Sequence, residues 1–172
     1  MKKLFLCAAV AVFAFANVNA QEFGVLAGFS NVSADFDGES DSESGFHIGA
    51  LAEFDLSEEF ALQPELTYTS AGDFSAANLN IIAKYAISEQ FNIQAGPQVG
   101  LIMGDVADLI DSFDDSSKLN LQLAAGVGYD IDENFFVQAR YGFQLNNHYT
   151  GDADFDLKFN TLTVGVGYKF GN

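Results

Sequence analysis

Cysteine, tryptophan and proline are almost absent from this chain of 172 residues, which has one cysteine, no tryptophan and two prolines. The cysteine, Cys7, lies in the first twenty residues, so the rest of the chain can form neither a disulfide nor a thiolate metal site. Basic residues are also scarce, with 7 lysines and arginines against 24 aspartates and glutamates. Without a basic patch to neutralise phosphates, nucleic acid is not an expected partner.

Long apolar runs are missing as well, because no stretch after residue 20 is apolar for 18 residues, as a transmembrane helix requires. The first twenty residues combine two lysines, an apolar run over 4–16 and the small-x-small triplet Val18-Asn19-Ala20. This pattern predicts a cleaved signal peptide over residues 1–20 and one domain over residues 21–172. If that domain meets a membrane, it must do so as a closed barrel.

Eight runs in the remaining chain alternate apolar and polar residues with the period of two that is typical of β-strands. In the last of them, Leu162, Val164 and Val166 alternate with Thr163 and Gly165. Runs of about ten residues suit tilted strands that cross an outer membrane. We therefore predict an all-β fold, an eight-stranded antiparallel up-and-down transmembrane β-barrel. The runs span residues 23–32, 45–56, 60–69, 77–87, 91–103, 119–130, 135–145 and 159–170.

The connections between these runs alternate between short and long. The short ones are residues 57–59, 88–90 and 131–134, and the long ones are 33–44, 70–76, 104–118 and 146–158. With both termini in the periplasm, every short turn falls on the periplasmic side and every long loop outside, as in outer-membrane barrels.

The charged residues indicate which face of the runs meets lipid. A soluble eight-stranded barrel such as a lipocalin is the alternative, with apolar residues inside and polar residues in water. All charges within the runs share the polar parity, which is otherwise rich in Gln, Asn, Thr and Gly. Among them are Glu53, Asp55, Glu65, Lys84, Arg140 and Lys169. A basic residue on the lipid face would cost about 2–4 kcal/mol at the midplane. The pattern therefore favours a polar interior and a lipid-facing apolar exterior.

Aromatic residues on the apolar parity mark the periplasmic end of every run, as an interfacial girdle would. They are Phe23, Phe54, Phe60, Tyr85, Phe91, Tyr129, Phe135 and Tyr168. The two prolines, Pro64 and Pro97, fall in the middle of runs, where the missing N–H removes a ladder bond. We expect β-bulges at both positions.

Three stretches carry a resemblance to a known family. Asn92-Ile93-Gln94-Ala95-Gly96-Pro97-Gln98-Val99-Gly100, Ala125-Gly126-Val127-Gly128-Tyr129-Asp130 and Phe135-Phe136-Val137-Gln138-Ala139-Arg140-Tyr141 resemble the small outer-membrane β-barrel (PorT-like) family of Bacteroidota. The resemblance covers residues 21–172 and implies the barrel type and an outer-membrane location. It implies no ligand and no catalytic residue.

Four charged side chains are expected to project into the lumen at similar heights, namely Glu53, Glu65, Lys84 and Arg140. Because buried charges need partners, we predict a salt-bridge network among Glu65, Lys84 and Arg140, with Glu53 nearby. An eight-stranded barrel leaves room only for side chains, which favours a structural plug over a gated ion path.

Acidic residues crowd the expected outer loops, and oxygen-rich loops can hold Ca²⁺ or bridge the divalent cations of a lipopolysaccharide surface. No loop has the complete twelve-residue calcium pattern, so solvated acidic loops are the simpler interpretation. The weak metal candidates are Asp105, Asp108, Asp111, Asp152, Asp154 and Asp156. The spacing of Val106, Leu109, Ile110 and Phe113 also fits a short amphipathic helix over the rim.

A lipid-modifying enzyme is a further alternative, because His148 lies with Thr150 just beyond the outer end of a run, where such a barrel enzyme would keep its site. Substitution of His148 would test it. Nothing in the sequence brings a base, a hydroxyl and an acid together there. We therefore expect no enzymatic activity and no cofactor. The sequence favours an envelope scaffold or cell-surface binding platform, with a narrow pore as the alternative. The expected partners are outer-membrane lipid and lipopolysaccharide, the barrel assembly machinery through the C-terminal strand, and an unknown extracellular ligand.

Overall fold

The computed structural model describes residues 21–36, 39–105, 107, 117–146 and 157–170 of the chain. Within these ranges no helix is both long and apolar enough to cross a membrane. The described residues form eight strands: β1 (Gln21–Phe36), β2 (Glu39–Asp55), β3 (Phe60–Ala71), β4 (Phe74–Ala86), β5 (Phe91–Met103), β6 (Leu119–Asp130), β7 (Phe135–Gln144) and β8 (Leu157–Lys169).

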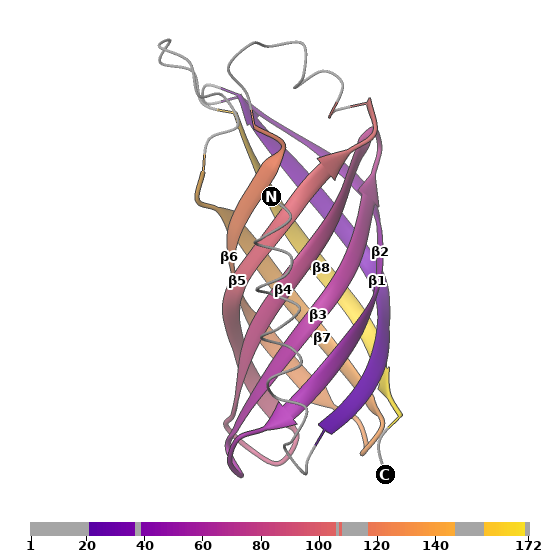
Figure 1. Cartoon of the computed structure of the whole chain (residues 1–172), viewed down its shortest axis with the longest axis vertical. Coiled ribbons are helices and arrows are strands. Elements are labelled where there is room, and N and C mark those ends of the chain that lie inside the picture. Colours follow the sequence, from indigo (N-terminus) through magenta and orange to yellow (C-terminus); the bar gives the residue numbers. More distant parts are fainter. Residues whose placement is uncertain (1–20, 37–38, 106, 108–116, 147–156, 171–172) are drawn as a thin grey trace, which may run out of the picture.

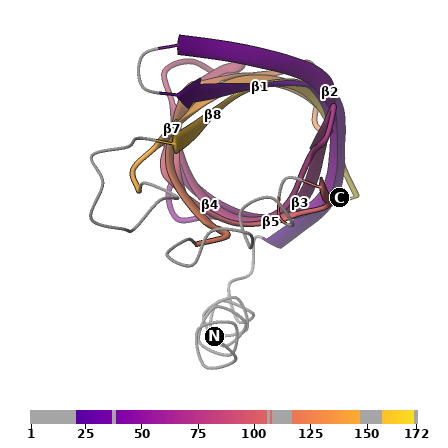
Figure 2. The same cartoon turned by 90° about the horizontal axis from the view of Figure 1, so that it is seen from above.

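The strands close into one barrel in chain order, and β1 pairs with β8 to complete the ring. All eight pairs are antiparallel (Figures 1 and 2). The predicted eight-stranded antiparallel barrel is therefore confirmed. We call the end where β1 begins and β8 finishes the turn end, and the opposite end the loop end.

Three turns at the turn end share one sequence pattern and one geometry. Their sequences are Leu56-Ser57-Glu58-Glu59-Phe60, Ile87-Ser88-Glu89-Gln90-Phe91 and Ile131-Asp132-Glu133-Asn134-Phe135. In each, the amide of the first residue donates to the carbonyl of the closing phenylalanine at 2.8 Å. The second residue accepts from that phenylalanine's amide through its side chain, at 3.1, 3.0 and 2.7 Å. The serine or aspartate thus supports each turn by a local side-chain bond.

Two of the four predicted long loops are wrong, because strand replaces most of each. β1 continues to Phe36 and β2 already begins at Glu39, so the expected loop over 33–44 is largely a hairpin. The expected loop over 70–76 contains the turn Gly72-Asp73, where Gly72 adopts a φ of 54° that favours glycine.

Burial alternates along the strands with polar residues inside and apolar residues outside. β7 shows this most regularly, with Phe136, Gln138, Arg140, Gly142 and Gln144 buried in turn. The large exposed apolar side chains lie on the other face, among them Ile93, Leu123, Val127, Phe143 and Val164. This arrangement is the reverse of a water-soluble barrel and matches the sequence prediction.

The predicted aromatic girdle is largely present on the outer face. Exposed members are Phe23, Phe60, Tyr85, Phe91 and Phe135, whereas Tyr129 and Tyr168 are half-buried and Phe54 is buried. Two pairs stack edge-to-face across neighbouring strands with ring centres 4.8 Å apart, Phe91 with Tyr129 and Phe135 with Tyr168.

The expected bulges at the two prolines do not occur. Pairing between β2 and β3 is interrupted near Pro64, and pairing between β4 and β5 near Pro97, but the register is the same on both sides of each gap. Each proline keeps its partner on the other neighbouring strand, Ile81 for Pro64 and Leu123 for Pro97. The missing N–H thus costs local ladder bonds without inserting a residue.

Candidate functional site

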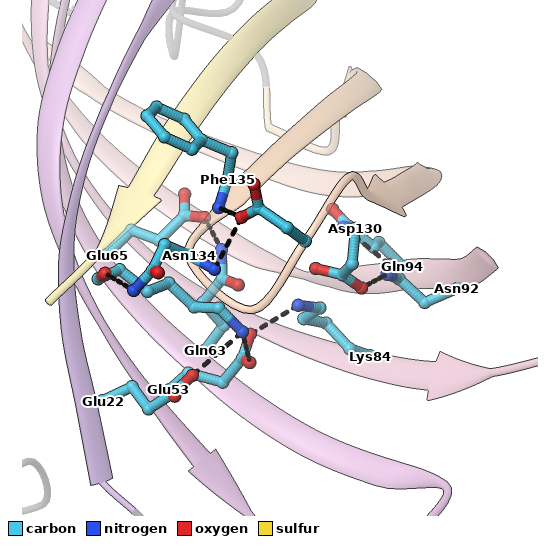
Figure 3. Close-up of polar contacts among 12 residues, drawn as sticks. Glu22, Glu53, Gln63, Glu65, Lys84, Asn92, Gln94, Asp130, Asn134 and Phe135 are labelled. Carbon is cyan, nitrogen blue, oxygen red and sulfur yellow. Dashed lines mark hydrogen bonds and ion pairs between the residues drawn. The ribbon is translucent and has the colours of Figure 1, made fainter. Parts of the chain in front are cut away.

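Four charged side chains from four strands meet inside the barrel near its turn end (Figure 3). Glu22 and Glu53 lie directly opposite each other in the β1–β2 pair, which brings two like charges together. Lys169 of β8 bridges them, with its Nζ 2.9 Å from Glu22 Oε2 and 2.9 Å from Glu53 Oε1. Lys84 of β4 donates to the other oxygen of Glu53 and lies 5.7 Å from the centre of the Phe136 ring, within cation–π range.

A bidentate ion pair joins opposite walls of the lumen. β3 and β7 lie four strands apart in the ring of eight, so Glu65 and Arg140 face each other across its diameter. Arg140 donates from Nη1 to Glu65 Oε2 at 2.9 Å and from Nη2 to Glu65 Oε1 at 2.5 Å. Gln63 and Asn80 donate to the same carboxylate at 2.5 and 3.0 Å. Glu65 is 2% exposed and Arg140 is 4% exposed, so the pair blocks the lumen at this level.

The pairing differs from the single network expected from the sequence, in which Lys84 would join Glu65 and Arg140. In the β3–β4 register Lys84 lies opposite Ala61, whereas Glu65 lies opposite Asn80. Four strand residues span about 13 Å, so Lys84 lies too near the turn end to reach Glu65. It pairs with Glu53 instead. The two separate groups carry equal numbers of positive and negative charges, which offsets part of the cost of burying them.

A small polar chamber lies above the central ion pair, on the side of the loop end. It has a volume of about 30 Å³ and is lined by Glu65 and Arg140 together with amide and hydroxyl side chains. Four of the lining atoms are buried and have no hydrogen-bond partner among the described residues: Asn80 Oδ1, Asn120 Oδ1, Gln138 Oε1 and Arg140 Nε. Since a bound water needs about 10–15 Å³ and several polar partners, the chamber suits about two water molecules and no larger solute.

Apolar side chains close the interior at two levels around this chamber. Nearer the turn end, Leu26, Leu51 and Phe136 pack together. At the loop end a second cluster, which we call the apolar cap, covers the lumen, and the rings of Phe74 and Phe159 meet there with centres 5.3 Å apart. The apolar cap consists of Val32, Ala71, Phe74, Ala76, Ile102, Ala107 and Phe159.

His47 lies inside the lumen, where its Nδ1 is 3.0 Å from Ser30 Oγ. A Cβ built on Gly165 would lie 2.8 Å from His47 Nε2 and 2.9 Å from the Ala27 carbonyl oxygen. The imidazole therefore needs a glycine on the adjacent wall. This explains one of the lumen-facing glycines by close approach rather than by backbone conformation.

Most of the weak metal candidates lie outside the described residues, namely Asp108, Asp111, Asp152, Asp154 and Asp156, and so do His148 and Thr150. Asp105 is described and is exposed. In the described part of the chain, no three His, Cys, Asp or Glu side chains are placed to hold a metal ion. Of the expected rim helix only positions 105 and 107 are described, and both are helical.

The sequence prediction did not assign partners to several residues that complete these groups. Glu22 lies one residue before the expected first run, and the parity of Gln63 and Asn80 predicts only that they face the lumen, whereas both donate to the Glu65 carboxylate. A further series of side-chain hydrogen bonds runs from Gln94, which donates to Asn92 at 2.8 Å, to Asp130, which accepts from Asn92 at 3.1 Å (Figure 3). The parity of these residues is visible in the sequence, but their partners depend on the stagger between strands.

The chain belongs to the outer membrane protein beta-barrel domain family, whose model matches residues 4–170. It is therefore a bacterial outer-membrane β-barrel with a filled polar interior. None of the curated proteins compared with the chain matches it.

Similar solved structures include Ail, the attachment invasion locus protein of Yersinia pestis, at 19% identity and a TM-score of 0.51, over 87% of this chain and 98% of that one. A second Ail structure, in complex with the heparin analogue sucrose octasulfate, has 18% identity and a TM-score of 0.53, over 87% of this chain and 99% of that one. Neisserial surface protein A has 17% identity and a TM-score of 0.56, over 88% of this chain and 100% of that one. At these identities the likeness establishes the fold.

Proposed function

We propose that this protein is a closed, non-enzymatic barrel that serves as an envelope scaffold or cell-surface binding platform. The observation that carries the proposal is the Glu65–Arg140 ion pair, which joins opposite walls of the lumen and is almost fully buried. The apolar cap closes the same lumen nearer the loop end. A barrel sealed at both levels can present its outer rim to partners without conducting ions.

The finer assignments belong to the same proposal. We infer membership of the PorT-like group of Bacteroidota, removal of residues 1–20 as a signal peptide, and a mature barrel over residues 21–172. The turn end then faces the periplasm and the loop end faces outside, as is usual for outer-membrane barrels. Lipopolysaccharide surrounds the apolar exterior, and the assembly machinery recognises the C-terminal strand, which is followed by Phe170.

The charge of the chain distinguishes its partner from the sulfated ligand seen with Ail. The net charge is −17, and exposed acids such as Asp41 and Glu43 stand at the loop end. Polyanions would be repelled by this rim. A partner of the surface platform is therefore expected to be basic.

The test combines folding and conductance on one sample. The mature protein is refolded in detergent micelles, compared boiled and unboiled by gel mobility, and then inserted into planar bilayers. We expect a compact, fast-running form that slows on boiling and shows no discrete current steps. A triple variant, Arg140→Ala with Phe74→Ala and Phe136→Ala, removes one residue from the central ion pair and one from each apolar cluster. It should produce current steps, which shows that the assay detects an open lumen.

A narrow pore for ions or small solutes is the second candidate, favoured by the polar lining of the chamber. Discrete current steps from the unmodified protein would establish the pore and overturn the closed scaffold. In that case single substitutions of Glu65, Lys84 or Arg140 should change the step size.

A further inference from the structure

Among the strands that the structure describes, the outer part of β2 has a neighbour on one side only. β2 pairs with β1 as far as Glu39↔Phe36. Its pairing with β3 begins only at Gly45↔Ala71, because β3 ends at Ala71. Among the described strands, none pairs with Glu39–Ser44 on the side away from β1. Figure 2 shows this end of β2 running outside the ring of the barrel. We call residues 39–44 the free edge.

The register shows which backbone groups the free edge presents. Phe170 donates its amide to the Phe23 carbonyl at 2.6 Å, so odd-numbered residues of β1 bond to β8 and even-numbered ones bond to β2. Val32 and Ala34 therefore bond to Glu43 and Asp41, their partners in the register. The residue between them, Ser42, directs its N–H and C=O away from β1.

Hydrogen bonding agrees with this assignment. The Ser42 amide donates to the side chain of its neighbour Asp41, at 2.8 Å, rather than to a neighbouring strand. Successive even residues of a strand share one side, so the backbone of Ser44 also faces outward. The six residues of the free edge span about 20 Å of strand. The β3–β4 turn adjoins its inner end, since a Cβ built on Gly72 would lie 2.9 Å from Glu43 Oε2.

The side chains of the free edge are polar and acidic. Asp41, Ser42, Glu43 and Ser44 are all exposed. Natural edges are commonly protected by charged side chains, by proline or by a bulge. This segment has no proline and no bulge, and all of its charges are acidic. Acids on the edge disfavour pairing with a second copy of the same chain, because like charges on adjacent strands repel. They favour a basic strand, because opposite charges on adjacent strands attract each other.

We propose that Glu39–Ser44 is a docking edge for an extended basic segment of a partner polypeptide, which adds as a strand beside β2. The proposal rests on the cell-surface binding role inferred above, because it places that binding on one strand. Backbone bonds to the outward groups of the edge would supply affinity, and Asp41 and Glu43 would select for positive charge.

The probe is a short synthetic peptide of alternating lysine and threonine, with a fluorescent label, titrated into the barrel in lipid nanodiscs. A second peptide of the same sequence carries N-methyl groups on alternate amides, which keeps its charge but blocks strand pairing. We expect the first peptide to bind and the second to bind about tenfold more weakly or not at all, a difference of about 1.4 kcal/mol. Binding should also slow hydrogen exchange at Ser42.

Two variants separate backbone from charge. Ser42→Pro removes an outward N–H without removing a bond to β1, and Ser42→Thr is its matched control. Asp41→Asn with Glu43→Gln removes two charges, and Glu58→Gln with Glu89→Gln removes two exposed charges at the turn end. We expect about tenfold weaker binding for the proline and for the Asp41/Glu43 variant, and unchanged binding for both controls.

Several outcomes would overturn the docking edge. One is equal binding of the methylated and unmethylated peptides, or of the proline and threonine variants, since attraction would then depend on charge alone. Another is a dimer of the barrel that Ser42→Pro dissociates, which would assign the edge to a second copy. Absence of peptide binding to a folded, non-conducting barrel would also reject the edge, while leaving the closed scaffold standing. Current steps from the same sample would instead reject the scaffold.

Discussion

Replacing Arg140 by methionine removes one half of the ion pair that crosses the lumen, and the cost of that change can be worked out from the contacts of Glu65. The carboxylate accepts two hydrogen bonds from Arg140 and one each from Gln63 and Asn80. After the substitution only the two neutral amides remain, and Glu65 is 2% exposed. Leaving a buried charge without its partner typically costs about 3–5 kcal/mol.

The double variant Arg140→Met with Glu65→Gln isolates the pair from the change in shape. Both charges are then absent, and buried pairs replaced by neutral residues often cost little. We expect the double variant to lie within about 1 kcal/mol of the unmodified protein, which makes the two changes strongly non-additive. Glu89→Gln, an exposed turn residue, is the control and should change stability by less than about 0.5 kcal/mol.

The measurement is reversible urea unfolding of the barrel in detergent micelles, followed by circular dichroism and by gel mobility. Circular dichroism is needed because the chain has no tryptophan to report on folding. The reasoning fails if Arg140→Met lies within about 1 kcal/mol of the unmodified protein, or if the double variant costs the sum of the two single ones.

Three further predictions use the same unfolding measurement. Gly165→Ala should cost about 1–3 kcal/mol by overpacking, and adding His47→Ala should recover part of the loss; no recovery would show that His47 is not the obstruction. Leu123→Arg on the exposed face should cost about 2–4 kcal/mol, and a neutral effect would mean that this face does not meet lipid or detergent. The backbone amides of Asn134 and Phe135 donate to Asp132 and hold the pKa of its carboxyl below its usual value. The ionised carboxylate therefore stabilises the folded barrel fully above the unfolded pKa of about 3.9, and this stabilisation disappears as the pH falls through the folded pKa. Asp132→Ala should therefore be less stable at neutral pH and lose that deficit in strong acid, and a deficit that persists in strong acid would contradict the assignment.

The sequence predicted strands well wherever one face meets lipid. β5 and β6 begin and end at the predicted residues, because apolar and polar residues alternate along most of each strand, with Ile102 and Ala124 as the exceptions. The outer end of β2 is predicted as loop because acids and serines occupy both of its faces. In β1 the apolar residues change parity, from odd positions up to Phe29 to even positions from Val32 onward, which interrupts the predicted pattern. That part of the hairpin extends past the last residue of β3, and a polar strand has no period of two to detect.

The lumen groups were predictable by type but not by partner. Glu53, Glu65, Lys84 and Arg140 have the parity of interior residues, and all four are buried. Which acid meets which base depends on the stagger between strands, which places Lys84 opposite Ala61. Tight turns fix the register of adjacent strands. The repeated turn pattern at residues 56–60, 87–91 and 131–135 could have supplied the registers of β2–β3, β4–β5 and β6–β7, whereas the β3–β4 register follows from the turn Gly72-Asp73.

Closure of the lumen rests on two kinds of barrier in series, apolar clusters and an ion pair. An ion entering at the loop end meets the apolar cap, where Phe74 and Phe159 offer no polar partner to replace its water. Beyond the chamber it meets Glu65 and Arg140, which already satisfy each other's charge and do not favour either sign. Removing the ion pair leaves the apolar barrier, and removing the cap leaves the pair. Nearer the turn end the lumen is also closed by Leu26, Leu51 and Phe136. No single variant should therefore conduct, and the triple Arg140→Ala, Phe74→Ala, Phe136→Ala variant is the one that tests whether the barrel is closed by its side chains.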